Sequence, residues 1–213
     1  MTKGCSGTDS PVMAVFNTLM NLVVLNICFL ISCIPFVTVG AAITALYSVN
    51  LKMVKGEEGY VFRGYWKGFV QNFRQGTVCW LFMIGAALIF ALDLRTARLF
   101  SGIVNQLFLA GAYAVGIVVL VVFLYVFPYM ARFQDGVGVC LKNALIIGGS
   151  RFGYTFALLF ITVAAVAASV YNPQMMAKAF FVWFTAGFAA LNYVKSYFFR
   201  NVFSVYENAK KYK

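Results

Sequence analysis

The stretch from Ser10 to Leu51 reads SPVMAVFNTLMNLVVLNICFLISCIPFVTVGAAITALYSVNL, and none of its residues carries a charge. A helix needs about 20 predominantly apolar residues to cross a hydrocarbon layer of roughly 30 Å. Such a helix pairs every backbone amide within the segment, as the lack of water inside a bilayer requires. The stretch is about twice as long as one crossing, so a single helix over it would overshoot the membrane.

A break inside this stretch is expected at Pro35. Proline ends a helix, Thr38 is a suitable N-cap for the next one, and Gly40 permits close packing. We therefore predict a helical hairpin whose second arm runs over residues 39–54. This arm is short and contains several polar residues, so a re-entrant or interfacial helix is the alternative.

Four further uncharged stretches extend the same pattern along the chain. Because 62% of the 213 residues are hydrophobic and the mean hydropathy is +0.85, no room is left for a sizeable water-facing domain. We predict an all-α fold, a polytopic transmembrane helical bundle of five or six spans, that forms a single integral membrane domain over residues 1–213. The further stretches are Gln75–Leu92, Leu99–Ala131, Phe152–Ala177 and Ala179–Val194.

The basic residues indicate the orientation of this bundle. Positively charged loops near span ends resist translocation, so the side richer in lysine and arginine is expected to be cytoplasmic. The opposite side holds only Arg95, Arg98 and Lys178, and Lys3 lies inside with six spans or outside with five. The C-terminus is cytoplasmic with either number. The loops assigned to the cytoplasm hold Lys52, Lys55, Arg63, Lys67, Arg74, Arg132, Lys142, Arg151, Lys195, Arg200, Lys210, Lys211 and Lys213.

The basic residues that indicate the orientation also account for the net charge of +11. They lie between apolar segments, where they set the topology and meet anionic lipids. We expect membrane lipids as partners and no nucleic acid.

The stretch from Tyr60 to Gln75 is the most patterned of these loops. Aromatic residues recur at spacings of three and four, and basic residues follow on another face, which is typical of an amphipathic helix in the headgroup region. One interpretation is a membrane-surface helix with snorkelling basic side chains. The other is a docking helix for a partner. The candidate residues for either role are Phe62, Arg63, Trp66, Lys67, Phe69, Asn72, Phe73 and Arg74.

Amides and hydroxyls inside the predicted spans form a second candidate set. Asn17 and Asn21 share a helix face at a spacing of four. Such amides commonly form hydrogen bonds between helices, worth about 0.6 to 2 kcal/mol each. Contact with a solute is the alternative. The polar set consists of Asn17, Asn21, Asn26, Thr38, Thr44, Ser48 and Asn50.

The chemistry of catalysis is poorly represented in this chain. There is no histidine, and the six acidic residues lie in loops or near span ends, which leaves neither a proton relay nor a nucleophile with its base. The five cysteines form no CxxC pair, and no phosphate-binding GxxxxGK[ST] motif is present. We therefore predict no enzymatic activity, no cofactor and no metal site.

Three motifs resemble a known family. Residues 26–50 contain the pattern P-x-x-T-x-G-x-x-x-x-A-L-Y from Pro35 to Tyr47, and the segments GEEGY (residues 56–60) and FVQNFRQ (residues 69–75) follow. The combination is similar to the YesL-like family of bacterial integral membrane proteins, a domain of unknown function. Its members are often encoded beside carbohydrate ABC importers. The resemblance implies a multi-pass protein of the bacterial plasma membrane with an accessory role in sugar uptake, and it implies no catalytic residues.

Two functions are therefore compared. The first is a non-catalytic accessory or scaffolding partner of a carbohydrate ABC importer, which docks on the permease through the helix over residues 60–75. The second is a facilitator or channel for a small neutral solute. Its lining would come from the polar set, namely Asn17, Asn21, Thr44, Ser48 and Asn50.

Overall fold

The computed structural model describes residues 11–57, 59–97, 99–133 and 135–211, and within these ranges the fold is all-helical. Lys3, which bears on the number of spans, lies outside them. The elements in chain order are α1 (Pro11–Ser32), the 3₁₀ turn η1 (Phe36–Thr38), α2 (Val39–Val54), α3 (Val61–Ala97), α4 (Gly102–Arg132), α5 (Val137–Ser150), α6 (Phe152–Val170), α7 (Pro173–Val182), the π-helical turn η2 (Trp183–Gly187) and α8 (Phe188–Lys211).

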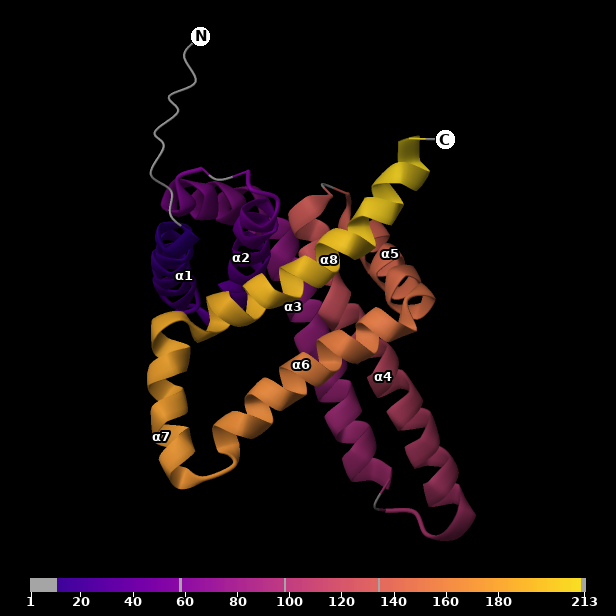
Figure 1. Ribbon diagram of the computed structural model, residues 1–213. Coiled ribbons are helices and arrows are strands. Elements are labelled where there is room, and N and C mark those ends of the chain that lie inside the picture. Colours follow the sequence, from indigo (N-terminus) through magenta and orange to yellow (C-terminus); the bar gives the residue numbers. More distant parts are fainter. Residues whose placement is uncertain (1–10, 58, 98, 134, 212–213) are drawn as a thin grey trace.

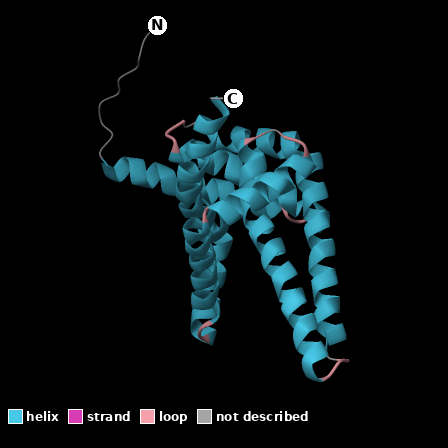
Figure 2. Ribbon diagram, turned by 90° about the vertical axis from the view of Figure 1, so that its right-hand side faces the viewer, coloured by secondary structure: helices cyan, strands magenta, loops and turns pink. Residues whose placement is uncertain are grey.

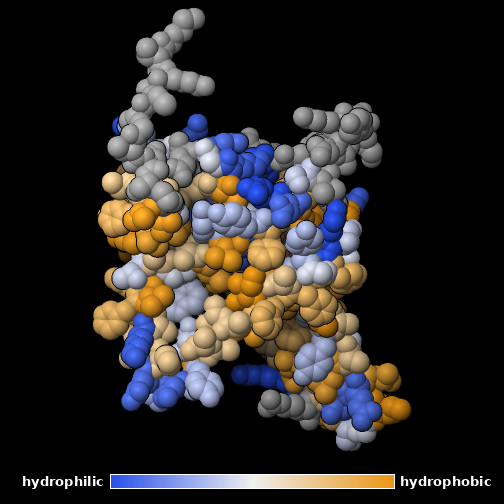
Figure 3. Space-filling model, viewed as in Figure 1, coloured by the Kyte–Doolittle hydropathy of each residue, from blue (hydrophilic) through white to orange (hydrophobic). Residues whose placement is uncertain are grey.

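Six helical segments in the described ranges are long and apolar enough to cross a membrane. The second arm of the first stretch is one of them, which favours six spans over five. Large apolar side chains are exposed along most of these segments (Figure 3), as expected of surfaces that face lipid. The protein is thus a multi-pass membrane protein. The six segments are Val12–Ser32, Phe36–Val54, Val61–Ala97, Gly102–Arg132, Phe152–Val170 and Pro173–Ser204.

The break predicted at Pro35 is present. α1 ends at Ser32, and η1 leads directly into α2. Thr38 occupies the N-cap position of α2, but its hydroxyl makes no capping bond. It donates instead to the carbonyl oxygens of Ser32 and Pro35, both at 2.7 Å. The threonine therefore fixes the turn between the two helices.

α2 is the buried centre of the bundle. It packs most extensively against α3, and most of its residues are buried. At the crossing, a Cβ added to Gly76 would lie 2.8 Å from both the backbone N and the Cα of Ala41, and one added to Gly40 would lie 2.6 Å from the Cβ of Trp80. Only glycine lets the two backbones approach this closely.

The C-terminus of α2 is closed by a glycine in the left-handed conformation. Gly56 has a φ of 72°. The amides of Glu57 and Gly56 donate to the carbonyl oxygens of Lys52 and Met53, both at 3.0 Å, which is the Schellman pattern of a helix end. Nη1 of Arg200 in α8 donates to the carbonyl oxygen of Val54 at 3.0 Å. These bonds satisfy the last carbonyls of α2 and fasten α8 to it.

The amphipathic segment near residues 60–75 is not a separate helix. It forms the first turns of α3, which continues unbroken for 37 residues into the following span. A helix of this length rises roughly 55 Å, which exceeds the hydrocarbon layer, so its first turns extend beyond that layer. The segment does not lie alone on the membrane because Gly64, Gly68 and Gly76 hold it against α2.

Figure 1 shows four of the connections at two opposite ends of the molecule. The α2–α3 and α4–α5 connections lie at the end toward which α8 runs, and we call this the basic end. The α3–α4 and α6–α7 connections lie at the opposite end. Toward that end the molecule splits into two legs, the α3–α4 leg and the α6–α7 leg (Figure 2). A hollow separates them in Figure 3.

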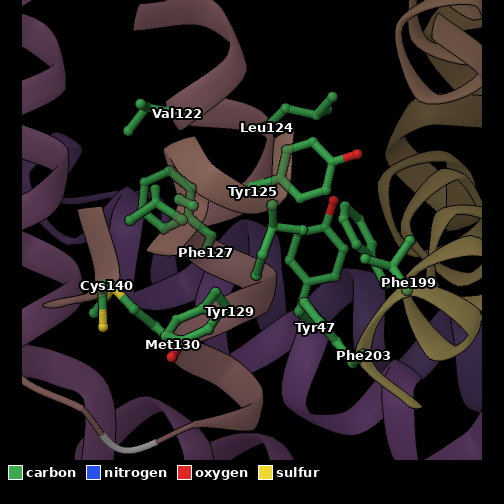
Figure 4. Close-up of a cluster of buried hydrophobic side chains, with 14 of the residues drawn as sticks. Tyr47, Val122, Leu124, Tyr125, Phe127, Tyr129, Met130, Cys140, Phe199 and Phe203 are labelled. Carbon is green, nitrogen blue, oxygen red and sulfur yellow. The ribbon is translucent and has the colours of Figure 1, made fainter. Parts of the chain in front are cut away.

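Two clusters of buried side chains join the helices. The larger one contains residues of α2, α3, α4, α5, α6 and α8, and part of it is drawn in Figure 4. In it the ring of Phe199 stands edge-on to the rings of Tyr47 and Tyr125, with centroids 5.6 and 5.5 Å away. The smaller cluster joins α1, α2 and the first turns of α3 around Leu25 and Leu46. Both clusters contain residues of α2, α3 and α8, so these three helices link them.

Candidate functional site: the basic end of the bundle

The first turns of α3 carry a row of aromatic rings, which we call the aromatic ladder. It consists of Phe62, Trp66, Phe69 and Phe73, whose successive ring centroids are 6.3, 5.6 and 5.5 Å apart. Trp66 and Phe69 pack against the smaller core cluster. Phe62 and Phe73 at the two ends are 55% and 44% exposed. The ladder is thus anchored in the middle and open at both ends.

Basic side chains border the ladder. Arg63, Lys67 and Arg74 are exposed on the same helix, and the guanidinium of Arg63 lies 5.6 Å from the ring centre of Tyr60. Asn72 is the exception in the docking set. It is buried, and its Nδ2 donates to the carbonyl oxygen of Gly68 at 2.9 Å. Seven of the eight predicted docking residues therefore lie on the accessible or half-buried side of α3.

A cavity with a volume of about 360 Å³ opens where α2, α3 and α4 meet at the basic end, and we call it the basic cavity. Its polar lining comes from three separate helices. Lys52 and Lys67 are exposed side chains that reach it from α2 and α3, and Arg132 reaches it from the end of α4. In the sequence, Lys52 and Arg132 indicated only the orientation, and Lys67 belonged to the docking set as well. Nothing in the spacing of the three residues indicated that they meet.

Two smaller cavities flank the basic cavity and share residues with it. One, of about 320 Å³, has Lys52, Lys67 and Arg63 in its lining, together with Glu57. The other, of about 40 Å³, lies between Arg132, Lys55 and Arg200. Six cations and one carboxylate thus line this connected region. Like charges that are close together repel one another, and a bound anion reduces this repulsion.

Asn26 of the polar set makes hydrogen bonds between helices. Its Nδ2 donates to the carbonyl oxygens of Trp183 and Phe184 at 3.1 and 2.8 Å, and its Oδ1 accepts from the amide of Ala189 at 3.1 Å. A π-helical turn leaves backbone groups without their usual partners, and here this occurs at η2. The amide of α1 supplies those partners.

The other members of the polar set do not gather around one channel. Asn50 donates to the carbonyl oxygen of Ala189 at 3.3 Å, which reinforces the contact made by Asn26. The hydroxyls of Thr44 and Ser48 donate to carbonyls of their own helix, Gly40 at 2.8 Å and Ala45 at 2.7 Å. Asn17 is exposed and Asn21 half-buried on α1. Ser48 alone of these lines the basic cavity.

A hydrogen-bonded group that the sequence did not reveal connects α4 to α5. The hydroxyl of Tyr129 donates to Oδ2 of Asp135 and accepts from Nδ2 of Asn143, both at 2.7 Å. The Sγ of Cys140 donates to the carbonyl oxygen of Asp135 at 3.3 Å. Burial raises the pKa of the Cys140 thiol to about 12, so this thiol stays neutral and unreactive.

No group of three or more histidine, cysteine or acidic side chains suited to a metal ion occurs among the described residues. An apolar cavity of about 490 Å³ lies between the helices of the α3–α4 leg, lined by residues such as Trp80, Phe90 and Phe123. Its walls offer few polar groups to orient a ligand. The basic cavity, in contrast, has three cations in its lining.

Residues 22–94 match the model of a family described as a protein of unknown function, DUF624. The match covers 73 of the 213 residues, and over this segment the chain is similar to that family. The YesL-like family is the same family, so the resemblance is confirmed over this segment. The DUF624 match covers part of α1, all of α2 and most of α3, and so includes the aromatic ladder and two walls of the basic cavity. No curated protein and no solved structure matches the chain.

Proposed function

We propose that this protein is a non-catalytic accessory or scaffolding subunit of a carbohydrate ABC importer in a bacterial plasma membrane. The observation that carries the proposal is the aromatic ladder of α3, anchored in the core and open at its ends. The choice of an importer rests on the similarity to the YesL-like family. The basic end faces the cytoplasm in this proposal, because lysine and arginine resist translocation.

The ladder has the composition and the rigidity of a protein contact surface. Interfaces are enriched in aromatic residues and arginine, and a few such side chains supply most of the binding energy. Close packing of Gly68 and Gly76 against α2 fixes this part of α3 on the bundle. Phe62 and Phe73 are consequently held in place before a partner arrives, which lowers the entropy lost on binding.

Purification from native membranes tests the proposal. The full chain, tagged at its C-terminus, is cross-linked in cells, extracted in a mild detergent and isolated, and co-purifying proteins are identified by mass spectrometry. We expect a permease subunit of a carbohydrate importer. The double variant F62A/F73A should reduce its recovery at least fivefold, because the exposed ends of the ladder are removed.

The matched control is F156A/F160A in α6. These phenylalanines are 72% and 75% exposed and lie outside the ladder. The control should leave recovery of the permease unchanged. Isolation of the chain without any permease subunit would refute the proposal, as would an equal loss in both double variants. The channel hypothesis is not carried forward because the polar residues assigned to its lining do not converge.

A further inference from the structure

The polar groups of the basic cavity are suited to an anion. Lys52, Lys67 and Arg132 supply three positive charges, and among the described residues that line the cavity none is acidic. Gln71 adds a neutral amide. The hydroxyl of Ser48 is already donated to the carbonyl oxygen of Ala45 at 2.7 Å, and Nδ2 of Asn72 donates to the carbonyl oxygen of Gly68 at 2.9 Å. The proposal therefore depends on Lys52, Lys67 and Gln71 as donors.

A phosphate group fits this lining better than a carboxylate does. A phosphomonoester carries close to two negative charges at neutral pH and three strong acceptor oxygens. Arginine binds phosphate through its planar fork, and lysine binds it as a point charge. A carboxylate offers one charge and two oxygens, so it would compensate one of the two lysine charges, whereas a phosphomonoester would compensate nearly both. The volume of about 360 Å³ lies within the range of small-molecule sites, roughly 300 to 1,000 Å³.

The position of the cavity is consistent with two sources of phosphate. It opens at the basic end, where the apolar helices leave the hydrocarbon layer and phospholipid headgroups lie. Apolar residues, Leu51 and Met130, also contribute to its wall. We propose that the basic cavity binds a phosphate group, supplied either by an anionic phospholipid headgroup or by a free phosphate compound. The cavity is formed by this chain alone, so the inference does not depend on the proposed importer.

Binding is measured on the purified full chain after its native lipids have been removed in detergent. In one arm, phosphatidylglycerol is titrated and bound lipid is counted by native mass spectrometry, with zwitterionic phosphatidylcholine for comparison. In the other, inorganic phosphate is titrated and followed by the width of its ³¹P resonance. The variant K52Q/K67Q removes two cavity charges from exposed side chains, and K67Q removes one.

The control variant is K142Q/R151Q, which removes the same amount of charge at residues outside the lining of the basic cavity. We expect wild type to bind phosphatidylglycerol or inorganic phosphate, K52Q/K67Q to bind it at least tenfold more weakly, and the control to change by less than twofold. Binding of the lipid alone assigns the site to a headgroup, and binding of inorganic phosphate assigns it to a free phosphate compound.

Two results would overturn the inference. One is that wild type binds neither probe. The other is that the control loses as much affinity as K52Q/K67Q, since binding would then follow net charge instead of the cavity. If K52Q/K67Q does not elute as a monodisperse protein, K67Q decides the matter with an expected loss of at least threefold.

Discussion

Leucines around α2 and leucines in the α3–α4 leg are equally apolar but have different surroundings. Leu46 of α2 is fully buried, whereas Leu88 of α3 is 61% exposed on the leg. Glycines bring the backbones of α2 and α3 together, and Asn26 of the neighbouring α1 donates a hydrogen bond to the carbonyl oxygen of Trp183 in η2. Most of the leg surface instead presents apolar side chains, as lipid-facing helices do. High hydropathy therefore marks both regions, and small residues and amides distinguish the packed one.

The largest effect is expected from forcing α2 and α3 apart. Gly76→Leu places a side chain where the backbone of Ala41 already lies, 2.8 Å from the position of a Cβ. We expect a loss of more than about 3 kcal/mol in stability and little monodisperse protein. The measurement is size-exclusion chromatography of a fluorescent fusion in mild detergent.

The control for this change is Gly85→Leu on the same helix. A Cβ at Gly85 would have no atom within 4 Å, so its elution profile should match that of wild type. If both leucine variants behaved alike, the contrast between the packed region and the leg would be wrong.

The second effect is expected from removing buried volume. Leu46→Ala should lower the free energy of unfolding by about 2 kcal/mol, because the cavity it leaves costs packing contacts even when the surrounding solvent is lipid. Leu88→Ala on the leg should lower it by less than about 0.5 kcal/mol, since lipid or detergent fills the space. Thermal unfolding in detergent measures both. Equal losses would mean that the leg is packed against protein.

The third effect concerns the hydrogen bonds across α1 and η2. Asn26→Ala leaves the carbonyl oxygens of Trp183 and Phe184 and the amide of Ala189 without their side-chain partner. We expect a loss of about 1.5 kcal/mol in the same unfolding assay. Asn17→Ala, on the exposed part of α1, should have almost no effect. A loss at Asn17 as large as that at Asn26 would contradict the assignment.

The smallest effect is expected at the end of α2. Gly56→Ala must keep a φ of 72°, a conformation that a residue with a Cβ adopts at a cost of about 1 kcal/mol. Gly59→Ala is the control, since Gly59 has no positive φ and a Cβ there would contact nothing within 4 Å. Unfolding temperatures in detergent should fall for Gly56→Ala alone. An unchanged value would show that the Schellman turn does not stabilise α2.

Part of the candidate site could be predicted from the sequence because it lies on one helix. The ladder from Phe62 to Phe73 repeats at helical spacing, and the structure confirms these residues as neighbours. Spacing alone could not show that Asn72 is buried. In the structure its Nδ2 donates to the carbonyl oxygen of Gly68 in the same helix. The basic cavity could not be foreseen, since its three cations come from α2, α3 and α4.

The sequence by itself determined the class of this protein: long uncharged segments must be helical and lipid-embedded, because a bilayer leaves backbone amides no other partner. It also located the break at Pro35, which follows from the covalent geometry of proline. Only the tertiary structure decided that α3 runs unbroken from the aromatic ladder into its span and that Lys52, Lys67 and Arg132 surround one cavity. The cavity depends on how closely α2 and α3 approach, and that distance is set by contacts between residues far apart in the chain.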